Sequence, residues 1–477
     1  MLRRVFWIAL ALVAFSAPRV AAQNLCSTTA SSKVACTVAN VYGVNGLTND
    51  GALAAENQHQ GQFGNSFLSN LGALNSSIGT QLGELPLVSP ASGISFSFNK
   101  SLGILVPAEY NFGPILSERA GMLGRHKFLV GFTYQNFQFQ TLDGAKLNNL
   151  PAVFTQQDTA GCSAGGNNIK GCAFIRDVIV TNDAIQLRVN QYTAYASYGI
   201  TDRFDISVAV PTINVREAAT SVATIKNNGS DNLYQFQSGT SGQGCSPNPC
   251  FNRTFFNSNG ATGIGDVTVR AKYEVWKGEN AGLAVGADVR FPTGDSLNYL
   301  GSGAYGVKPF GALSFGFKRV SAHVNGGYEW NGSSFLAGNI TPSQANGTVA
   351  ATKDNLPAQV VYSVGAEVGI IKRLSAAFDF LGQEILNAPR IKSGTFQELP
   401  ACSAAAPVSA CNTFNATGAT DPIFQEYKSS YATANAAVGL RYRIFGHFLL
   451  TGNVVFKLND AGLRSKYIPL VGLTFSH

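Results

Sequence analysis

The feature that most constrains this chain is a two-residue period, which recurs in segments of roughly ten residues from residue 127 onward. In residues 265–276 small and apolar side chains alternate with charged or hydroxyl ones, and the same alternation returns in 280–292, 358–371 and 430–443. Successive side chains of a strand point to opposite faces, so each segment is expected to be a strand with one apolar and one polar face. The pattern predicts an all-β protein.

The connections between these segments alternate in length. Tight turns near 201–202, 278–279 and 372–373 are separated by long connections, many of them rich in Asn, Ser, Gly and Thr. This alternation is typical of a transmembrane antiparallel β-barrel, with short turns at one end and long loops at the other. We expect about 12 strands (12–14, if a strand near 94–99 joins the barrel). The expected strands are residues 127–140, 186–199, 202–216, 265–276, 280–292, 308–317, 320–331, 358–371, 373–387, 430–443, 447–457 and 467–476.

The first 22 residues have the pattern of a secretory signal peptide. Arg3 and Arg4 precede the apolar run 5–15, and the small residues of Val20-Ala21-Ala22 follow it. A membrane anchor is the alternative, but it needs about 20 apolar residues. The predicted organisation is a signal peptide (1–22), an N-terminal segment (23–125) and a barrel (126–477). The even strand number places both ends of the barrel on the periplasmic, short-turn side of a bacterial outer membrane.

The N-terminal segment, residues 23–125, lacks the barrel pattern. Leucines at three- and four-residue spacing indicate a short amphipathic helix within 64–83, and Ile94, Phe96 and Phe98 alternate as a short strand. Because both ends of the barrel are expected to be periplasmic, this segment is expected to start at the periplasmic mouth of the lumen, and one interpretation is a plug inside the barrel. A periplasmic extension or additional strands remain alternatives.

The cysteines form four close pairs in the sequence, which favours disulfides within short loops. An exported protein meets an oxidising compartment, whereas metal knuckles or free thiols fit this spacing less well. Three of the pairs fall in long loops. The disulfide candidates are Cys26 with Cys36, Cys162 with Cys172, Cys245 with Cys250, and Cys402 with Cys411.

Composition excludes several classes of function. Charged residues make up 13% of the chain, about half the usual ~25%, and hydrophobic residues 45%, which excludes a disordered protein. No basic stripe is present, so we expect no nucleic-acid partner. The expected partners are outer-membrane lipid, the machinery that assembles outer-membrane barrels and a small-molecule solute. The C-terminal strand, with Phe475 third from its end, is typical of barrels that this machinery inserts.

The barrel lumen is expected to collect the polar strand faces, because a charge facing lipid at the bilayer midplane costs about 2–4 kcal/mol. Charges of both signs either neutralise one another or line a pore. Phe137 and Phe139 break the polar pattern, which indicates an apolar step for a hydrophobic substrate, a bulge or packing against a plug. The predicted lumen-lining residues are Arg203, Asp205, Arg270, Lys272, Glu274, Asp288, Arg290, His323, Glu329, Glu367, Asp379, Arg441, Arg443, Phe137 and Phe139.

Catalytic and cofactor motifs are weak, so we expect no enzyme, no cofactor and no metal site. Residues 301–306 match G-x-G-x-x-G, but they lie in an expected loop and open no helix. Asp295 is a single carboxylate, too few ligands for a cation. His323 shares its strand with Ser321 and Glu329, but neighbours two apart on a strand are ~7 Å from each other, too far for a catalytic triad.

Several strand and turn motifs carry a family resemblance. Residues 263–276 (GIGDVTVRAKYEVW), 290–295 (RFPTGD), 301–303 (GSG) and 198–205 (YGITDRFD) resemble the outer-membrane family named for a MetA pathway of phenol degradation, near the long-chain fatty-acid transporter barrels. The resemblance implies an outer-membrane transporter or porin-like channel for small hydrophobic or aromatic compounds. The alternative is a surface-exposed binding protein, an adhesin or receptor, that works through its long outer loops.

Overall fold

The computed structural model describes the barrel almost completely and the N-terminal segment in part. The described residues are 26, 33–42, 49–51, 74–81, 96–99, 104–107, 116–155, 176–228, 234–236, 251–317, 319–338, 340, 351–398, 418–445 and 447–476.

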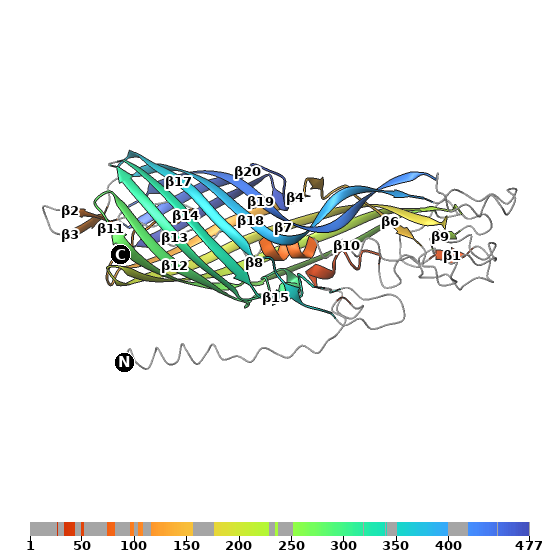
Figure 1. Ribbon diagram of the computed structural model, residues 1–477, viewed down its shortest axis with the longest axis horizontal. Helices are drawn as coiled ribbons and strands as arrows, with labels where there is room; N and C mark the ends of the chain where they lie inside the picture. The colour runs from red at the N-terminus through yellow and green to blue at the C-terminus, as the bar shows by residue number, and fades with distance from the viewer. Residues whose placement is uncertain are drawn as a thin grey trace.

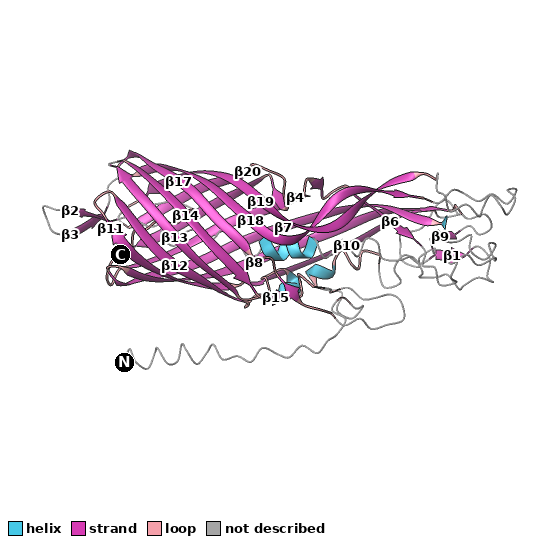
Figure 2. Cartoon of the chain, viewed as in Figure 1, coloured by secondary structure: helices cyan, strands magenta, loops and turns pink. Residues whose placement is uncertain are grey.

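The chain forms a closed antiparallel barrel of twelve strands, which confirms the predicted fold (Figures 1 and 2). Neighbours along the chain pair with one another, and the last strand pairs with the first, from Leu470 with Gln135 to Ser476 with Leu129. The strands are β4 (Phe128–Leu142), β7 (Val178–Thr201), β8 (Phe204–Lys226), β11 (Val267–Lys277), β12 (Ala281–Phe291), β13 (Gly306–Phe317), β14 (Val320–Asn331), β17 (Gln359–Ile371), β18 (Leu374–Gln397), β19 (Thr420–Arg443), β20 (Phe448–Lys457) and β22 (Tyr467–Ser476).

Four strands continue far beyond the barrel wall at the end with the long connections, which we call the long-loop end. β7, β18 and β19 hold 24 residues each and β8 holds 23, whereas roughly ten cross a bilayer. β6 (Leu150–Thr155) and β10 (Asn252–Ile264) add to this extension by pairing with β7 and β8. From the sequence pattern, residues 217–226 and 252–264 are expected to be loops. They are strands because β8 forms backbone hydrogen bonds with β7 on one side and with β10 on the other, beyond the barrel wall.

Small elements occupy the connections and the N-terminal segment. None of the helices in the described part of the chain is long and apolar enough to cross a membrane. The small elements are η1 (Val34–Cys36), helical residues 74–81, η5 (Ser296–Asn298), β5 (Ala145–Lys146), β21 (Leu463–Ser465), and the pairs β1 (Asn49–Gly51) with β9 (Tyr234–Phe236), β2 (Phe96–Asn99) with β3 (Ile104–Pro107), and β15 (Ser333–Ser334) with β16 (Asp354–Asn355).

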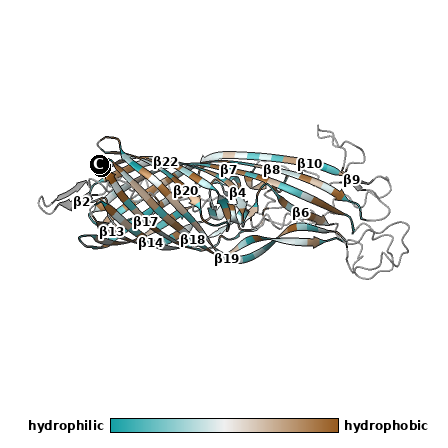
Figure 3. Ribbon diagram, turned by 90° about the horizontal axis from the view of Figure 1, so that it is seen from above, coloured by the Kyte–Doolittle hydropathy of each residue, from teal (hydrophilic) through white to brown (hydrophobic). Residues whose placement is uncertain are grey.

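The barrel wall is apolar outside. Hydrophobic positions gather along its strands in Figure 3, and large side chains such as Phe132, Val364 and Leu440 are exposed there. Inside, charged side chains lie toward the other end, which we call the short-turn end. A cluster of buried apolar residues that includes Phe137, Leu187 and Leu463 lies toward the long-loop end. The outward apolar face is what a barrel wall in lipid requires.

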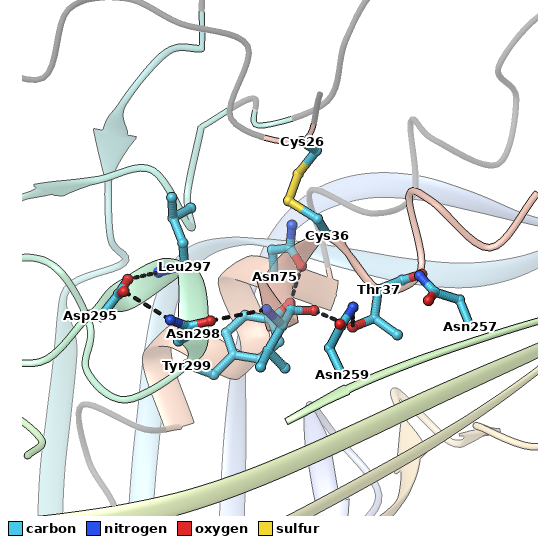
Figure 4. The surroundings of a disulfide bond; sticks show 11 residues. Cys26, Cys36, Thr37, Asn75, Asn257, Asn259, Asp295, Leu297, Asn298 and Tyr299 are labelled. Carbon is cyan, nitrogen blue, oxygen red and sulfur yellow. Dashed lines mark hydrogen bonds between the residues drawn. A yellow bond between two sulfur atoms is a disulfide. The ribbon is translucent and has the colours of Figure 1, made fainter. Parts of the chain in front are cut away.

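Part of the N-terminal segment docks at the long-loop end. The predicted disulfide between Cys26 and Cys36 is formed (Figure 4). Thr37, next to it, accepts a hydrogen bond at its backbone oxygen from Asn257 Nδ2 at 2.9 Å. Lys33 pairs with Asp295 at 2.6 Å. The remaining cysteine candidates, Cys162, Cys172, Cys245, Cys250, Cys402 and Cys411, lie outside the described residues.

Other parts of this segment lie elsewhere along the barrel. Residues 74–81 are helical, within the helix predicted for 64–83, and Asn75 accepts a hydrogen bond from the hydroxyl of Tyr299 beside η5. The β2–β3 hairpin projects from the short-turn end (Figure 1). From the sequence, the start of this segment is expected at the short-turn mouth, whereas the described residues 33–42 contact the long-loop end.

Candidate functional site: the barrel lumen

The structure buries most of the predicted lumen residues. Arg270 is half-buried, with 16% of its side chain exposed. Arg203 is exposed because it lies in the turn before β8, and Arg443 is half-buried as the last residue of β19. A pore-lining role of these residues stays a prediction. The buried members are Asp205, Lys272, Glu274, Asp288, Arg290, His323, Glu329, Glu367, Asp379, Arg441, Phe137 and Phe139.

The chain just before β4 crosses the lumen near its short-turn end. We call residues 116–123 the lumen segment. Ser117 Oγ donates to Asp379 Oδ1 of β18 at 2.6 Å, and Leu123 N donates to Asp205 Oδ2 of β8 at 2.8 Å. Ala120 N donates to Ser314 Oγ of β13 at 2.8 Å. These partners belong to strands at different positions around the barrel, so the segment lies across the lumen.

Glu118 anchors the lumen segment to β11. Its carboxylate pairs with the guanidinium of Arg270 and, at 2.9 Å, with Lys272 Nζ. The same ammonium donates to the backbone oxygens of Arg119 and Gly121, each at 3.1 Å. A buried carboxylate is tolerated only where such partners replace its water. The segment is therefore attached by charge as well as by hydrogen bonds.

The ion pairs continue across β12, β13 and β14. Arg270 binds Asp288 through two hydrogen bonds, of 2.6 and 2.8 Å, and Lys308 lies 3.4 Å from the same carboxylate. Arg290 pairs with Glu329 at 3.1 Å. Each of these carboxylates is paired with a cation of a neighbouring strand, so this part of the wall is neutralised by its own ion pairs. This arrangement corresponds to the interpretation in which the lumen charges neutralise one another.

A cavity of about 230 Å³ lies in the lumen on the long-loop side of this ion-pair network. Glu118, Arg270, Asp288, Arg290 and Glu329 form part of its wall, and apolar side chains form another part. The apolar lining includes Phe137, Phe139, Leu381, Val455, Leu463 and Ile468.

The two phenylalanines of β4 face this cavity in phase with their strand. Their rings stack with centroids 6.1 Å apart. β4 pairs with β7 from Phe128 with Tyr198 to Phe139 with Leu187 without a register shift. A bulge therefore does not explain why Phe137 and Phe139 point inward. The apolar step is part of a regular strand.

A much smaller cavity borders the lumen segment itself. A second cavity of about 10 Å³ is lined by Glu118, Arg119 and Leu123, together with Asp205 and Lys272 of the wall. A space of this size holds about one water molecule. This cavity beside the lumen segment is therefore too small for a solute.

His323 and Asp295, which are not expected to be catalytic or to bind a cation, form polar contacts with other residues. Ser314 Oγ and His323 Nδ1, on paired strands, lie 2.9 Å apart. Among the described residues, His323 Nε2 has no hydrogen-bond partner, so no acidic group completes a triad. Asp295 caps η5 by accepting from Leu297 N, besides pairing with Lys33. Within the described chain, no three His, Cys, Asp or Glu side chains are placed to hold a metal.

Several residues that line the lumen, or pair with residues that line it, were not predicted from the sequence. Glu118 and Arg119 belong to a segment without strand periodicity, and their signal was two adjacent opposite charges in a stretch with few charges. Lys308 follows the polar phase of its strand and could have been found from it. Arg464 and Ser465 lie in a connection, where no face can be assigned from a period of two.

Comparison with known proteins gives one family match. The model of the family described as "Putative MetA-pathway of phenol degradation" matches residues 180–366. No curated protein matches the chain.

Solved outer-membrane barrels are similar at low identity. The COG4313 outer membrane channel from Pseudomonas putida F1 is 11% identical, with a TM-score of 0.40, over 75% of this chain and 98% of that one. The P. putida toluene transporter TodX is 9% identical (TM-score 0.29, 74% and 89% covered). A Pseudomonas aeruginosa FadL homologue is 8% identical (TM-score 0.26, 73% and 88% covered). Over residues 180–366, from β7 into β17, the chain is similar to the family described as "Putative MetA-pathway of phenol degradation", which confirms the resemblance inferred from its strand and turn motifs.

Proposed function

We propose that the chain is an outer-membrane transporter for small hydrophobic or aromatic compounds. The observation that carries this proposal is the cavity of about 230 Å³ enclosed by the barrel, with stacked Phe137 and Phe139 on one wall and paired charges on another. Apolar ligand sites with a few placed polar groups are the usual architecture for small molecules. The family match supports the same class of solute. No catalytic step is proposed.

The lumen segment is proposed to act as the plug of this transporter. Its contacts with β8, β11, β13 and β18, and the small space around it, support a passage that is closed toward the short-turn end. In this proposal both ends of the barrel face the periplasm, and the barrel-assembly machinery inserts the protein. A solute would enter from the long-loop end and stay bound in the cavity until a displacement of the lumen segment opens the passage.

Single-channel conductance of the refolded chain in a planar bilayer tests the plug first. We expect mostly silent insertions with rare openings, together with uptake of a neutral aromatic solute into liposomes that contain the protein. Steady open conductance would overturn the plug but leave diffusion through the barrel. Lack of solute uptake by a folded barrel would overturn the transport proposal.

The extension of β7, β8, β18 and β19 beyond the wall favours one alternative, a surface-binding protein. Shortening these strands to the barrel rim separates the two functions. A transporter with shortened strands is expected to keep solute flux. A binding protein would lose its partner while its flux, if it has any, stays unchanged.

A further inference from the structure

Two consecutive side chains in the connection between β20 and β22 are buried with unused hydrogen-bonding groups. Arg464 and Ser465 are each 5% exposed. Among the described residues, Arg464 Nε and Ser465 Oγ have no hydrogen-bond partner. Arg464 Nη2 is held by the backbone oxygen of Ala434 at 2.8 Å and by Asn435 Oδ1 at 2.6 Å, which fixes the guanidinium. Buried polar groups nearly always have partners, so this unused pair calls for an explanation.

The backbone brings both side chains to the same place. Neighbouring residues of a regular strand point to opposite faces. The pairing of β21 with β4, however, shifts its register between Arg464 and Ser465. Such irregularities re-aim side chains. Both residues line the cavity together with Phe137 and Phe139.

The charges around the cavity leave Arg464 in surplus. The described lining residues carry the carboxylates of Glu118, Asp288 and Glu329, and each of these pairs with Arg270, Lys272, Arg290 or Lys308. No carboxylate within the described chain pairs with Arg464.

Asp460 acts on Arg464 electrostatically but forms no ion pair with it. Asp460 of the same connection is 59% exposed and pairs with Lys457 instead. Burial lowers the pKa of Arg464 to about 10, which leaves the group protonated at neutral pH. The apolar side of the cavity therefore holds a cation that can accept an anionic partner.

We propose that Arg464 and Ser465 bind the carboxylate of a small aromatic acid whose ring lies against Phe137 and Phe139. The guanidinium Nε–H and the serine hydroxyl supply two donors, as a carboxylate with two oxygens requires. The size fits, since an apolar cavity of about 150 Å³ binds benzene and this cavity is about 230 Å³. This inference rests on the proposed function and adds an anionic group to the solute.

Titration calorimetry of the full chain in detergent tests this inference with three probes: phenylacetate, its neutral isostere phenylacetamide, and acetate, which lacks the ring. We expect phenylacetate to bind at least about tenfold more tightly than either other probe, because hydrogen bonds to charged groups are the strong ones. Arg464→Gln should abolish the preference over phenylacetamide, and Arg464→Lys should restore part of it. Lys466→Gln, which removes an exposed cation two residues away, is the matched control and should change nothing.

Equal binding of phenylacetate and phenylacetamide by the wild-type chain would overturn the inference, as would an unchanged preference in Arg464→Gln. Heat-dependent migration on gels verifies that each variant is a folded barrel. Liposome uptake of both aromatic probes separates the two claims. Uptake of both without preference refutes the anion site and leaves the proposed transport intact, whereas uptake of neither refutes transport.

Discussion

Replacing Glu118 by Gln tests whether the lumen segment closes the barrel. The side chains of Glu118 and Lys272 are 9% and 5% exposed, and their charged atoms lie 2.9 Å apart. Removal of one partner of a buried ion pair costs about 3–5 kcal/mol. Arg270 keeps Asp288, whereas Lys272 keeps the backbone oxygens of the lumen segment. We therefore expect a cost of about 3 kcal/mol, the lower end of this range. This cost raises the equilibrium constant between the docked and the displaced lumen segment roughly 100-fold in favour of the displaced one.

Planar-bilayer recording measures this shift as the fraction of time that a single channel is open. We expect Glu118→Gln to raise the open fraction toward the 100-fold limit, unless the channel saturates in the open state, while Glu118→Asp stays close to wild type. Glu279→Gln, in an exposed turn at the same end of the barrel, is the matched control. If Glu118→Gln folds and conducts like the wild-type chain, the ion pair does not hold a gate and the reasoning fails.

Three further predictions concern the cavity and the long-loop end. Phe137→Ala removes a stacked ring and should weaken binding of an aromatic solute about 3- to 10-fold, whereas the outward-facing Phe132→Ala should not; calorimetry with the same solute decides. Burial raises the pKa of Glu217, in the extension, to about 8. The folded state holds this proton more tightly than the unfolded state, so the free energy of unfolding should fall as pH rises from about 4.5 to about 8. The urea midpoint of Glu217→Gln should lack this decrease with pH, which urea unfolding at several pH values measures. Cys36→Ser should destabilise the docked N-terminal segment by about 3 kcal/mol, seen as faster proteolysis there, and a reductant should reproduce the effect in wild type and add nothing in the variant.

The barrel itself was predictable because each strand is subject to the same two constraints. Lipid requires an apolar residue at every second position, and the lumen tolerates charge, so a period of two marks both a strand and its orientation. The expected strand 265–276, for example, is β11 (Val267–Lys277), and Arg270 and Lys272 face inward as their phase required. Phe137 kept its phase as well, although its apolar character suggested an irregularity.

The strand ends at the long-loop end were not predictable from the same signal. Beyond the bilayer, neither face of a strand meets lipid, and residues such as Thr220, Ser221 and Thr224 of β8 then resemble a loop in composition. Their strand structure depends on residues of β7 and β10 that lie tens of residues away along the chain and bond on either side of β8. Local patterns hold no record of such pairing, so the expected strands stopped at the rim.

The contacts that close the lumen were hidden for a related reason. The role of Glu118 depends on its ion pairs with Arg270 and Lys272, which lie more than 150 residues away in the sequence. The sequence around each of these residues does not indicate which opposite charge it pairs with. The same holds for Arg464, whose surplus charge becomes visible only when every carboxylate around the cavity has been assigned to another cation. A strand pattern specifies which side chains enter the lumen. Which of them neutralise one another, and which one is left for a ligand, depends on how the closed barrel brings the strands together, and this is why the fold was accessible from sequence and the site was not.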